Sequence, residues 1–226
     1  MKHEILYRPS YSLLQVLLEP GEQLVAEAGA MVSMTPNVQM QTQARGGVLS
    51  GLKRAVLGGE SFFINTFTGT AGQGEATFAP SLPGDMMHVP LAGGVMMVQS
   101  GSFICATPGI NMDTKWGGAK TFFAGKGLFL LKCEGQGDLF ISSYGAIHSV
   151  ELQAGQHYIV DTGHIVAFEG TTSFSIRGAG GLKQTLFSGE GLVCEFVGPG
   201  RIYLQTRSFE AFVSVLTPHL PKSSGS

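Results

Sequence analysis

The sequence predicts an all-β fold built from three pseudo-symmetric antiparallel repeats, with a short helix at the C-terminal end. Glycine supplies 33 of the 226 residues, roughly twice its usual share, and this abundance indicates many short elements joined by tight turns. Glycine landmarks recur in the same order three times along the chain. The segments between them are short and rich in β-branched and aromatic residues, which is typical of strands.

Each predicted repeat contains the same series of glycines. A turn glycine comes first, at Gly21, Gly93 and Gly155, and a second glycine follows at Gly29, Gly101 and Gly163. Each unit closes on a Gly-x-Gly triplet, at 72–74, 135–137 and 198–200. We therefore expect repeats at about 1–80, 81–142 and 143–207, arranged around a pseudo-threefold axis.

Strands are expected at Ile64–Thr68, Leu128–Lys132 and Leu139–Ser143. Ser208 is a good helix N-cap, and it precedes an apolar stripe that stops before Pro218, so the sequence predicts a helix over 208–217. A second candidate helix covers 49–57, in an insertion of the first repeat. No linker separates the repeats, so we expect one domain over 1–221 and a flexible tail over 222–226.

Composition excludes several functional classes. The 14 Lys and Arg residues against 16 Asp and Glu give a net charge of −2, so the chain has no excess positive charge for DNA, and RNA binding is not expected. Cys105, Cys133 and Cys194 are odd in number and far apart, a pattern that predicts neither disulfides nor a structural zinc site. The N-terminus runs directly into strand-like sequence without a targeting segment, so a cytoplasmic protein is expected.

The stretch Gly51-Leu52-Lys53-Arg54, followed by Glu60 to Thr68, resembles a widespread family of uncharacterised proteins. This family is grouped with a mitochondrial-biogenesis protein named for altered inheritance of mitochondria, and its fold is described as like that of the tryptophan RNA-binding attenuator protein. The resemblance implies a TRAP-like β fold related to double-stranded β-helices, self-association into a homo-oligomer, and no established activity. It supplies no catalytic residues and no cofactor. Mitochondrial members would carry a targeting segment, so a prokaryotic cytosolic member is expected.

Three lysines follow the predicted repeat: Lys53, Lys120 and Lys183 occupy equivalent positions. Around a pseudo-threefold axis their ammonium groups would form a ring that could hold an anion. The alternative is that each lysine stem covers apolar surface or binds turn carbonyls.

His157 and His164, with Asp161 and Glu169 nearby, are the candidate metal ligands. They would converge if residues 157–161 and 164–168 formed a hairpin, although the other two repeats have no histidine at these positions. The alternative is that both histidines face solvent.

Three functional hypotheses remain. The leading one is a homo-oligomeric assembly or binding module without catalytic activity, acting through a broad surface or an axial site. The first alternative is a cupin-like metal- or small-molecule-dependent enzyme centred on His157 and His164. The second is RNA binding by analogy of fold, which alone does not transmit function. The apolar 48–57 insertion would either dock on a partner or membrane surface, or pack on its own β unit.

Overall fold

A computed structural model describes residues 1–42, 56–57, 60–61, 64–113, 130–178 and 192–221. In these residues the chain is mostly β-strand, with one short C-terminal helix, α2 (Phe209–Leu216). The predicted fold class is therefore confirmed at this level. The described residues contain no helix that is both long and apolar enough to cross a membrane.

Four strands near the N-terminus form a small sheet. Its order is β1-β2-β9-β4, from strands β1 (Lys2–Leu6), β2 (Leu13–Leu18), β9 (Gly74–Phe78) and β4 (Met31–Met34). In β2, Leu14, Val16 and Leu18 are buried while the residues between them are partly exposed. This alternation is the period of a strand with one face on a core.

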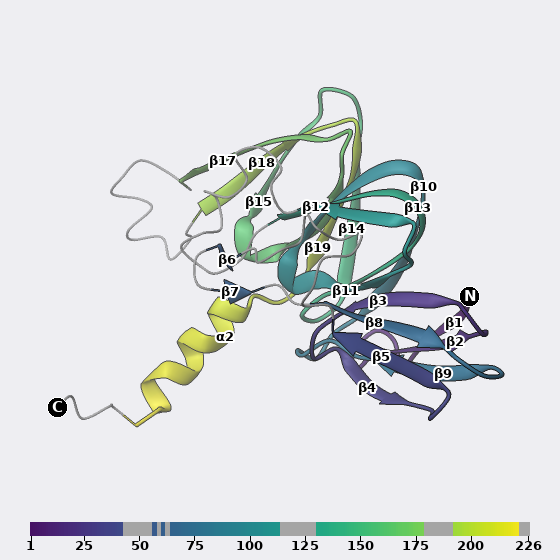
Figure 1. The fold of residues 1–226 in the computed structure, drawn as a ribbon. Coiled ribbons are helices and arrows are strands. Elements are labelled where there is room, and N and C mark those ends of the chain that lie inside the picture. Colours follow the sequence, from purple (N-terminus) through teal and green to yellow (C-terminus); the bar gives the residue numbers. More distant parts are fainter. Residues whose placement is uncertain (43–55, 58–59, 62–63, 114–129, 179–191, 222–226) are drawn as a thin grey trace.

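A ten-stranded sheet runs through the whole molecule (Figure 1). Its order is β14-β19-β16-β10-β13-β11-β3-β8-β5, with β12 also paired to β13. The strands are β14 (Ile147–Leu152), β19 (Gly200–Gln205), β16 (Ile165–Glu169), β10 (Met86–Gln99), β13 (Leu130–Ser142), β11 (Phe103–Ala106), β3 (Gln23–Glu27), β8 (Ile64–Gly69), β5 (Val38–Thr42) and β12 (Ile110–Asp113). The two longest, β10 and β13, pair along most of their length and join the N-terminal strands to the C-terminal ones.

Two smaller sheets complete the described strands. One has the order β15-β18-β17, from β15 (His157–Asp161), β18 (Leu192–Val197) and β17 (Ser173–Gly178). The other pairs β6 (Val56–Leu57) with β7 (Glu60–Ser61). Two single 3-10 turns link strands, η1 (Ser100–Ser102) and η4 (Thr162–His164).

The same ladders occur in three successive stretches of chain. β2 pairs with β9, the first half of β10 with the second half of β13, and β14 with β19. β4, β11 and β16 each pair with the last strand of their own stretch, and each has one irregularity in register, between Met31 and Ser33, between Phe103 and Cys105, and between Ile165 and Ala167.

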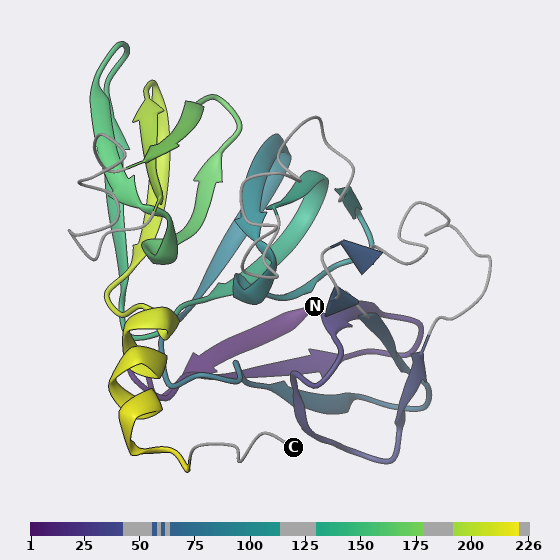
Figure 2. The same ribbon diagram turned by 90° about the vertical axis from the view of Figure 1, so that its left-hand side faces the viewer.

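Buried residues form three clusters in the core. Figure 2 shows the N-terminal, middle and C-terminal strands as separate groups. Phe67 and Phe78 meet edge to face in the N-terminal cluster, with ring centroids 5.0 Å apart. In the C-terminal cluster Phe168 packs on Phe196 at 5.1 Å. Such aromatic pairs add specific geometry to apolar burial.

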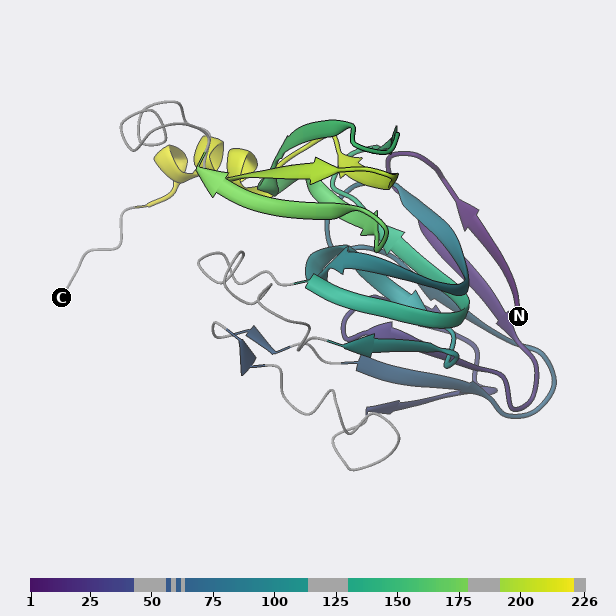
Figure 3. The ribbon, with the colours of Figure 1, turned by 90° about the horizontal axis from the view of Figure 1, so that it is seen from above.

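Seen from above, α2 projects from the side of the molecule away from the N-terminus (Figure 3). Ser208 is its N-cap and accepts a hydrogen bond from the Ala211 amide at 3.4 Å, as the sequence predicts. The second predicted helix, 49–57, lies mostly outside the described residues, as does the tail 222–226, and Val56–Leu57 form strand β6.

The predicted strands are confirmed where they are described, since Ile64–Thr68 lies in β8, and Leu128–Lys132 and Leu139–Ser143 belong, where described, to β13. The expected break between the last two is wrong, because β13 continues through Gly135 and Gly137. These glycines have φ of 125° and 150°, and a Cβ at Gly135 would overlap the Gly109 carbonyl oxygen, so the close approach of this segment, rather than a turn, requires glycine. The expected hairpin of 157–161 with 164–168 is also not formed, because η4 redirects the chain and β15 pairs with β18 while β16 pairs with β10 and β19.

Candidate functional site

A pocket of about 860 Å³ lies between α2 and the ends of several strands. One wall is α2 with its flanking residues, which contribute Ser208, Phe209, Glu210, Val213, Ser214 and Thr217. The remaining wall is formed by Glu27, Pro80, Ser81, Leu82, Gln99, Gly101, Ile104, Ser142, Ser143, Tyr144, Gly163 and Gln205. These residues come from all three groups of strands, so the pocket is a place where the N-terminal, middle and C-terminal parts of the chain meet. Its size is that of a small-molecule site.

Glu27 is the acidic residue of the strand wall, at the C-terminal end of β3. Burial raises the pKa of its carboxyl group from 4.5 to about 7, because desolvation penalises the charged form. Among the described residues, none forms a hydrogen bond or ion pair with this carboxyl group. Glu27 is therefore near half protonation at neutral pH, and either form has unused hydrogen-bonding capacity that faces the pocket.

The helix α2 is amphipathic, but most of its apolar residues stay exposed. No residue of α2 is buried, and Phe209, Phe212, Val213 and Leu216 are all exposed. Phe212 contacts the ring of Tyr144 edge to face, with centroids 6.1 Å apart. Phe209 and Val213, one helical turn apart, line the pocket, so the helix presents an apolar side to it.

Gln205 fixes one part of the wall through three hydrogen bonds. Its side-chain amide donates to the Gly163 carbonyl at 2.8 Å and accepts from the Tyr144 amide at 2.9 Å. Its own carbonyl accepts from His164 Nδ1 at 2.7 Å. The end of β19 is thus tied to both η4 and the segment that follows β13, and these pocket residues keep a fixed spacing.

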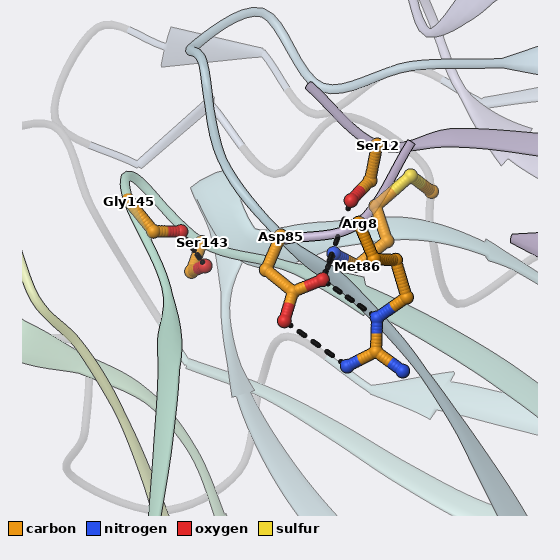
Figure 4. Close-up of polar contacts among 6 residues, drawn as sticks. All are labelled: Arg8, Ser12, Asp85, Met86, Ser143 and Gly145. Atoms are coloured by element: carbon orange, nitrogen blue, oxygen red, sulfur yellow. Dashed lines mark hydrogen bonds and ion pairs between the residues drawn. The ribbon is translucent and has the colours of Figure 1, made fainter. Parts of the chain in front are cut away.

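A buried carboxylate fixes the neighbouring segment (Figure 4). Asp85 Oδ1 accepts from Arg8 Nε at 2.8 Å, from Ser12 Oγ at 3.3 Å and from the Met86 amide at 2.8 Å, and Oδ2 accepts from Arg8 Nη2 at 3.0 Å. The Asp85 backbone also donates to Gly145 and accepts from the Ser143 amide. This arrangement holds Ser142 and Ser143, two pocket residues, against the N-terminal strands.

A second polar cluster lies on β1, β10 and β13, away from the pocket lining. His88 Nε2 donates to Asp138 Oδ1 at 2.7 Å, and the ring of His3 lies 4.4 Å from that of His88. His3 Nδ1 is buried and has no hydrogen-bond partner among the described residues. Burial, followed by the neighbouring His88, lowers the pKa of His3. These three residues are far apart in sequence, and no local pattern marks them.

The two histidines that the sequence singles out have separate partners. His157 Nδ1 contacts Glu195 Oε1 at 2.9 Å on an exposed surface, whereas His164 binds the Gln205 carbonyl. Of their expected companions, Asp161 accepts from the Gly163 amide at 2.7 Å and Glu169 accepts from the Arg201 amide at 3.0 Å. The described part of the chain contains no group of three His, Cys, Asp or Glu residues placed to hold a metal ion.

The three lysines of the expected anion site, Lys53, Lys120 and Lys183, lie outside the described residues. The ring of cations therefore stays a prediction. The pocket itself was not predicted, because Glu27 follows an ordinary strand pattern and its partners in the lining come from distant parts of the sequence.

Comparison with known proteins identifies relatives along nearly the whole chain. The model of the family described as mitochondrial biogenesis AIM24 matches residues 3–207. An uncharacterized protein of Streptococcus pyogenes serotype M6 is 31% identical over 222 residues, which cover 95% of this chain and 89% of that protein. A crystal structure of a Streptococcus pyogenes protein, a Northeast Structural Genomics Consortium target, matches with a TM-score of 0.79 and 28% sequence identity, covering 97% of this chain and 99% of that one. The family resemblance seen in the sequence is thus confirmed, and the chain belongs to the mitochondrial biogenesis AIM24 family.

Proposed function

We propose that this protein is a non-catalytic binding module that acts as a homo-oligomer and holds an amphipathic small molecule in the pocket beside α2. The ligand has an apolar body and a polar end that donates hydrogen bonds, with a primary amine as the best fit. The observation that carries the proposal is Glu27, a largely buried carboxyl group with a raised pKa that faces a pocket large enough for such a ligand.

Charge in the pocket supports a cationic or neutral donor over an anion. The described lining residues include the carboxyl groups of Glu27 and Glu210, but no Lys, Arg or His. An amine would pair with ionised Glu27 and offset its desolvation, while a carboxylate would meet like charge. The apolar body would lie against Leu82, Ile104 and Phe209.

The same lining supports binding rather than catalysis. Several serines line the pocket, but the described lining residues include no His, Lys or Cys beside them. A serine nucleophile needs an adjacent base that also orients it. Among the described residues, the Glu27 carboxyl group forms no hydrogen bond to any of these serines, so the described groups do not form such a pair.

The oligomeric part of the proposal rests on the strand pattern. We propose that the three stretches with matching ladders are equivalent repeats, as the glycine series predicts. Open β units leave strand edges that natural proteins commonly cover by symmetric association. Likeness to the attenuator protein remains a prediction, and no described feature favours RNA.

The ligand class is tested by isothermal titration with decylamine, decanol and decanoate, each below its aggregation concentration. We expect saturable binding of decylamine to the protein and weaker binding of decanoate. The variant Glu27→Gln should bind decylamine at least about tenfold more weakly, since a charge-assisted hydrogen bond is worth roughly 1.5–3 kcal/mol. Val213→Trp should block the pocket for all three ligands.

The matched control is Glu4→Gln, because Glu4 lies exposed on β1 and does not line the pocket. It should leave decylamine binding unchanged. If decylamine does not bind, or binds Glu27→Gln as tightly as the unchanged protein, the ligand class is wrong. Native mass spectrometry of the untagged protein tests the oligomeric part independently.

A further inference from the structure

Several of the described strands lie at the edge of their sheet, and β4 and β15 are two of them. β4 is the last strand of the four-stranded sheet and pairs only with β9, and β15 is the last strand of the three-stranded sheet and pairs only with β18, among the strands that the structure describes. Figure 1 shows β15 in the upper part of the molecule and β4 at its lower end, with β11, β3 and β8 between them. The two edges therefore do not meet within one chain.

The corresponding strands elsewhere in the chain are joined to each other. β3 pairs with β11, opposing Ala26 to Cys105 and Val25 to Ala106. β10 pairs with β16, opposing Val98 to Ala167 and Met97 to Phe168. The two junctions pair equivalent strands. β3 and β10 each precede a short turn within their own stretch of chain, and β11 and β16 each follow such a turn in the next stretch.

These junctions also share one register. The irregularities in β4, β11 and β16 align Ser33 with Cys105 and Ala167, and Met34 with Ala106 and Phe168. The predicted glycine series aligns β15 with β3 and β10, so that Val160 corresponds to Ala26 and Val98. A third junction in this register would oppose Val160 to Ser33, and Ile159 to Met34.

Exposure differs at the positions where a third junction is missing. Ile159 is 53% exposed, whereas its counterparts Val25 and Met97 are 7% and 3% exposed. Met34 is 40% exposed, whereas Ala106 and Phe168 are buried. The two residues that this register opposes are thus both large, apolar and accessible, and their pairing would remove apolar surface from water.

A groove and the local charges also suit a strand at this place. A groove of about 380 Å³ lies beside β15 and is lined by Tyr158, Ile159, Val160, Leu204 and neighbouring residues. β4 consists of Met31, Val32, Ser33 and Met34, with no charged residue of the kind that usually protects an open edge. The groove lining also includes Asp161, whose carboxylate accepts a hydrogen bond from the Gly163 amide. An uncharged, apolar strand can enter the groove without bringing a further charge into it.

We propose that β4 of one copy of this chain pairs antiparallel with β15 of a second copy, with Met34 opposite Ile159 and Ser33 opposite Val160. This inference rests on the homo-oligomer of the proposed function and names its interface. Because different edges meet, the contact is head to tail, and a pair of copies keeps β15 of the first copy and β4 of the second copy free for further copies. The assembly therefore closes into a ring or grows as a filament.

The test mixes two single variants of the full chain, Met34→Cys and Ile159→Cys, and oxidises them with copper phenanthroline. Cross-strand neighbours have the Cα separation that a disulfide requires. We expect a disulfide-linked dimer of twice 23.8 kDa in the mixture, joined between positions 34 and 159 by mass spectrometry of peptides, and little dimer with either variant alone. The control mixes Ile159→Cys with Met40→Cys, which is similarly exposed on β5, and it should give no dimer.

The second measurement is the native mass of Met34→Lys and of Ile159→Lys. Each charge should reduce the assembly to single chains, with an unchanged circular dichroism spectrum as the check on folding. A native oligomer without the 34–159 disulfide would overturn this interface and leave the homo-oligomer standing. A protein that stays a single chain at every concentration would overturn both the interface and the homo-oligomer. The double variant Met34→Cys/Ile159→Cys gives a further check: a 34–159 disulfide within one chain, without a dimer, would overturn the contact between copies.

Discussion

Arg8 and Asp85 form a bidentate ion pair between residues that are 77 positions apart, with Arg8 Nε and Nη2 each bound to a different carboxylate oxygen of Asp85 at 2.8 and 3.0 Å. The Asp85 side chain is 5% exposed and that of Arg8 48%. The aspartate therefore depends on its partners for stabilisation, while the arginine keeps contact with water. Loss of Arg8 is therefore costly, because it leaves the buried Asp85 carboxylate without its positive partner.

Replacing Arg8 should destabilise the fold by roughly 2–4 kcal/mol, because Arg8→Met leaves a buried carboxylate with only neutral donors. Arg8→Lys should recover part of this loss, since an ammonium group cannot bind both oxygens as a guanidinium does. Urea unfolding curves give these free energies. In the double variant Arg8→Met/Asp85→Leu the two losses should not add, and full additivity would show that the pair has no coupling energy.

Gly84 lies in the same region, where residues 83–85 meet 143–145. A Cβ at this position would overlap the Ser143 carbonyl oxygen, and backbone cannot move aside as a flexible side chain can. Gly84→Ala should therefore cost on the order of 3 kcal/mol. Gly94→Ala is the matched control, since a Cβ there meets no atom within 4 Å. Equal melting temperatures of the two variants would contradict the close approach of these segments.

Local sequence patterns were sufficient for part of this fold. The glycine series predicted a β-rich chain, and Ser208 followed by Phe209, Phe212 and Val213 predicted the helix, because turns and helix caps depend on neighbouring residues. The same reasoning failed at β13, where Gly135 and Gly137 do not form a turn. They are needed for a close approach by residues near Gly109, which local sequence does not show.

The candidate site was beyond such patterns for the same reason. The pKa of Glu27 is unusual because folding buries its carboxyl group. Ile104, Leu82 and α2, which line the same pocket, come from three other places in the chain. His3, His88 and Asp138 likewise meet only through the pairing of their strands. Conversely, His157 and His164 are close in sequence, yet η4 directs them to different partners. Long-range pairing, and not spacing along the chain, decides which side chains meet.

Glu27 should make stability fall as pH rises. Its folded-state pKa of about 7 lies above the ordinary 4.5, so the folded chain binds more protons than the unfolded chain between these values, and its stabilising effect is lost as pH rises through 7. Glu27→Gln imitates the protonated side chain. The variant should match the unchanged protein near pH 4 and exceed its free energy of unfolding by up to about 3 kcal/mol near pH 8. If the free energy of unfolding of the two proteins changed with pH in parallel, Glu27 would have to be hydrated in the folded chain.

His3 should have the opposite effect, because its folded-state pKa is lowered and not raised. The unfolded chain then binds more protons than the folded one just below pH 6.5, so the stability that neutral His3 contributes is present above pH 6.5 and is lost as pH falls toward the folded-state value. Burial is the main cause; His88 and the N-terminal amine also lower the pKa, while Asp138 raises it.

His3→Phe keeps a ring against Phe140 and removes the titrating group, so its unfolding free energy should decline less between pH 7 and pH 5 than that of the unchanged protein. Urea unfolding at these two pH values measures the difference, with Lys2→Gln on the exposed neighbouring position as control. An equal decline in His3→Phe and the unchanged protein would mean that His3 is protonated in the fold as readily as in the unfolded chain.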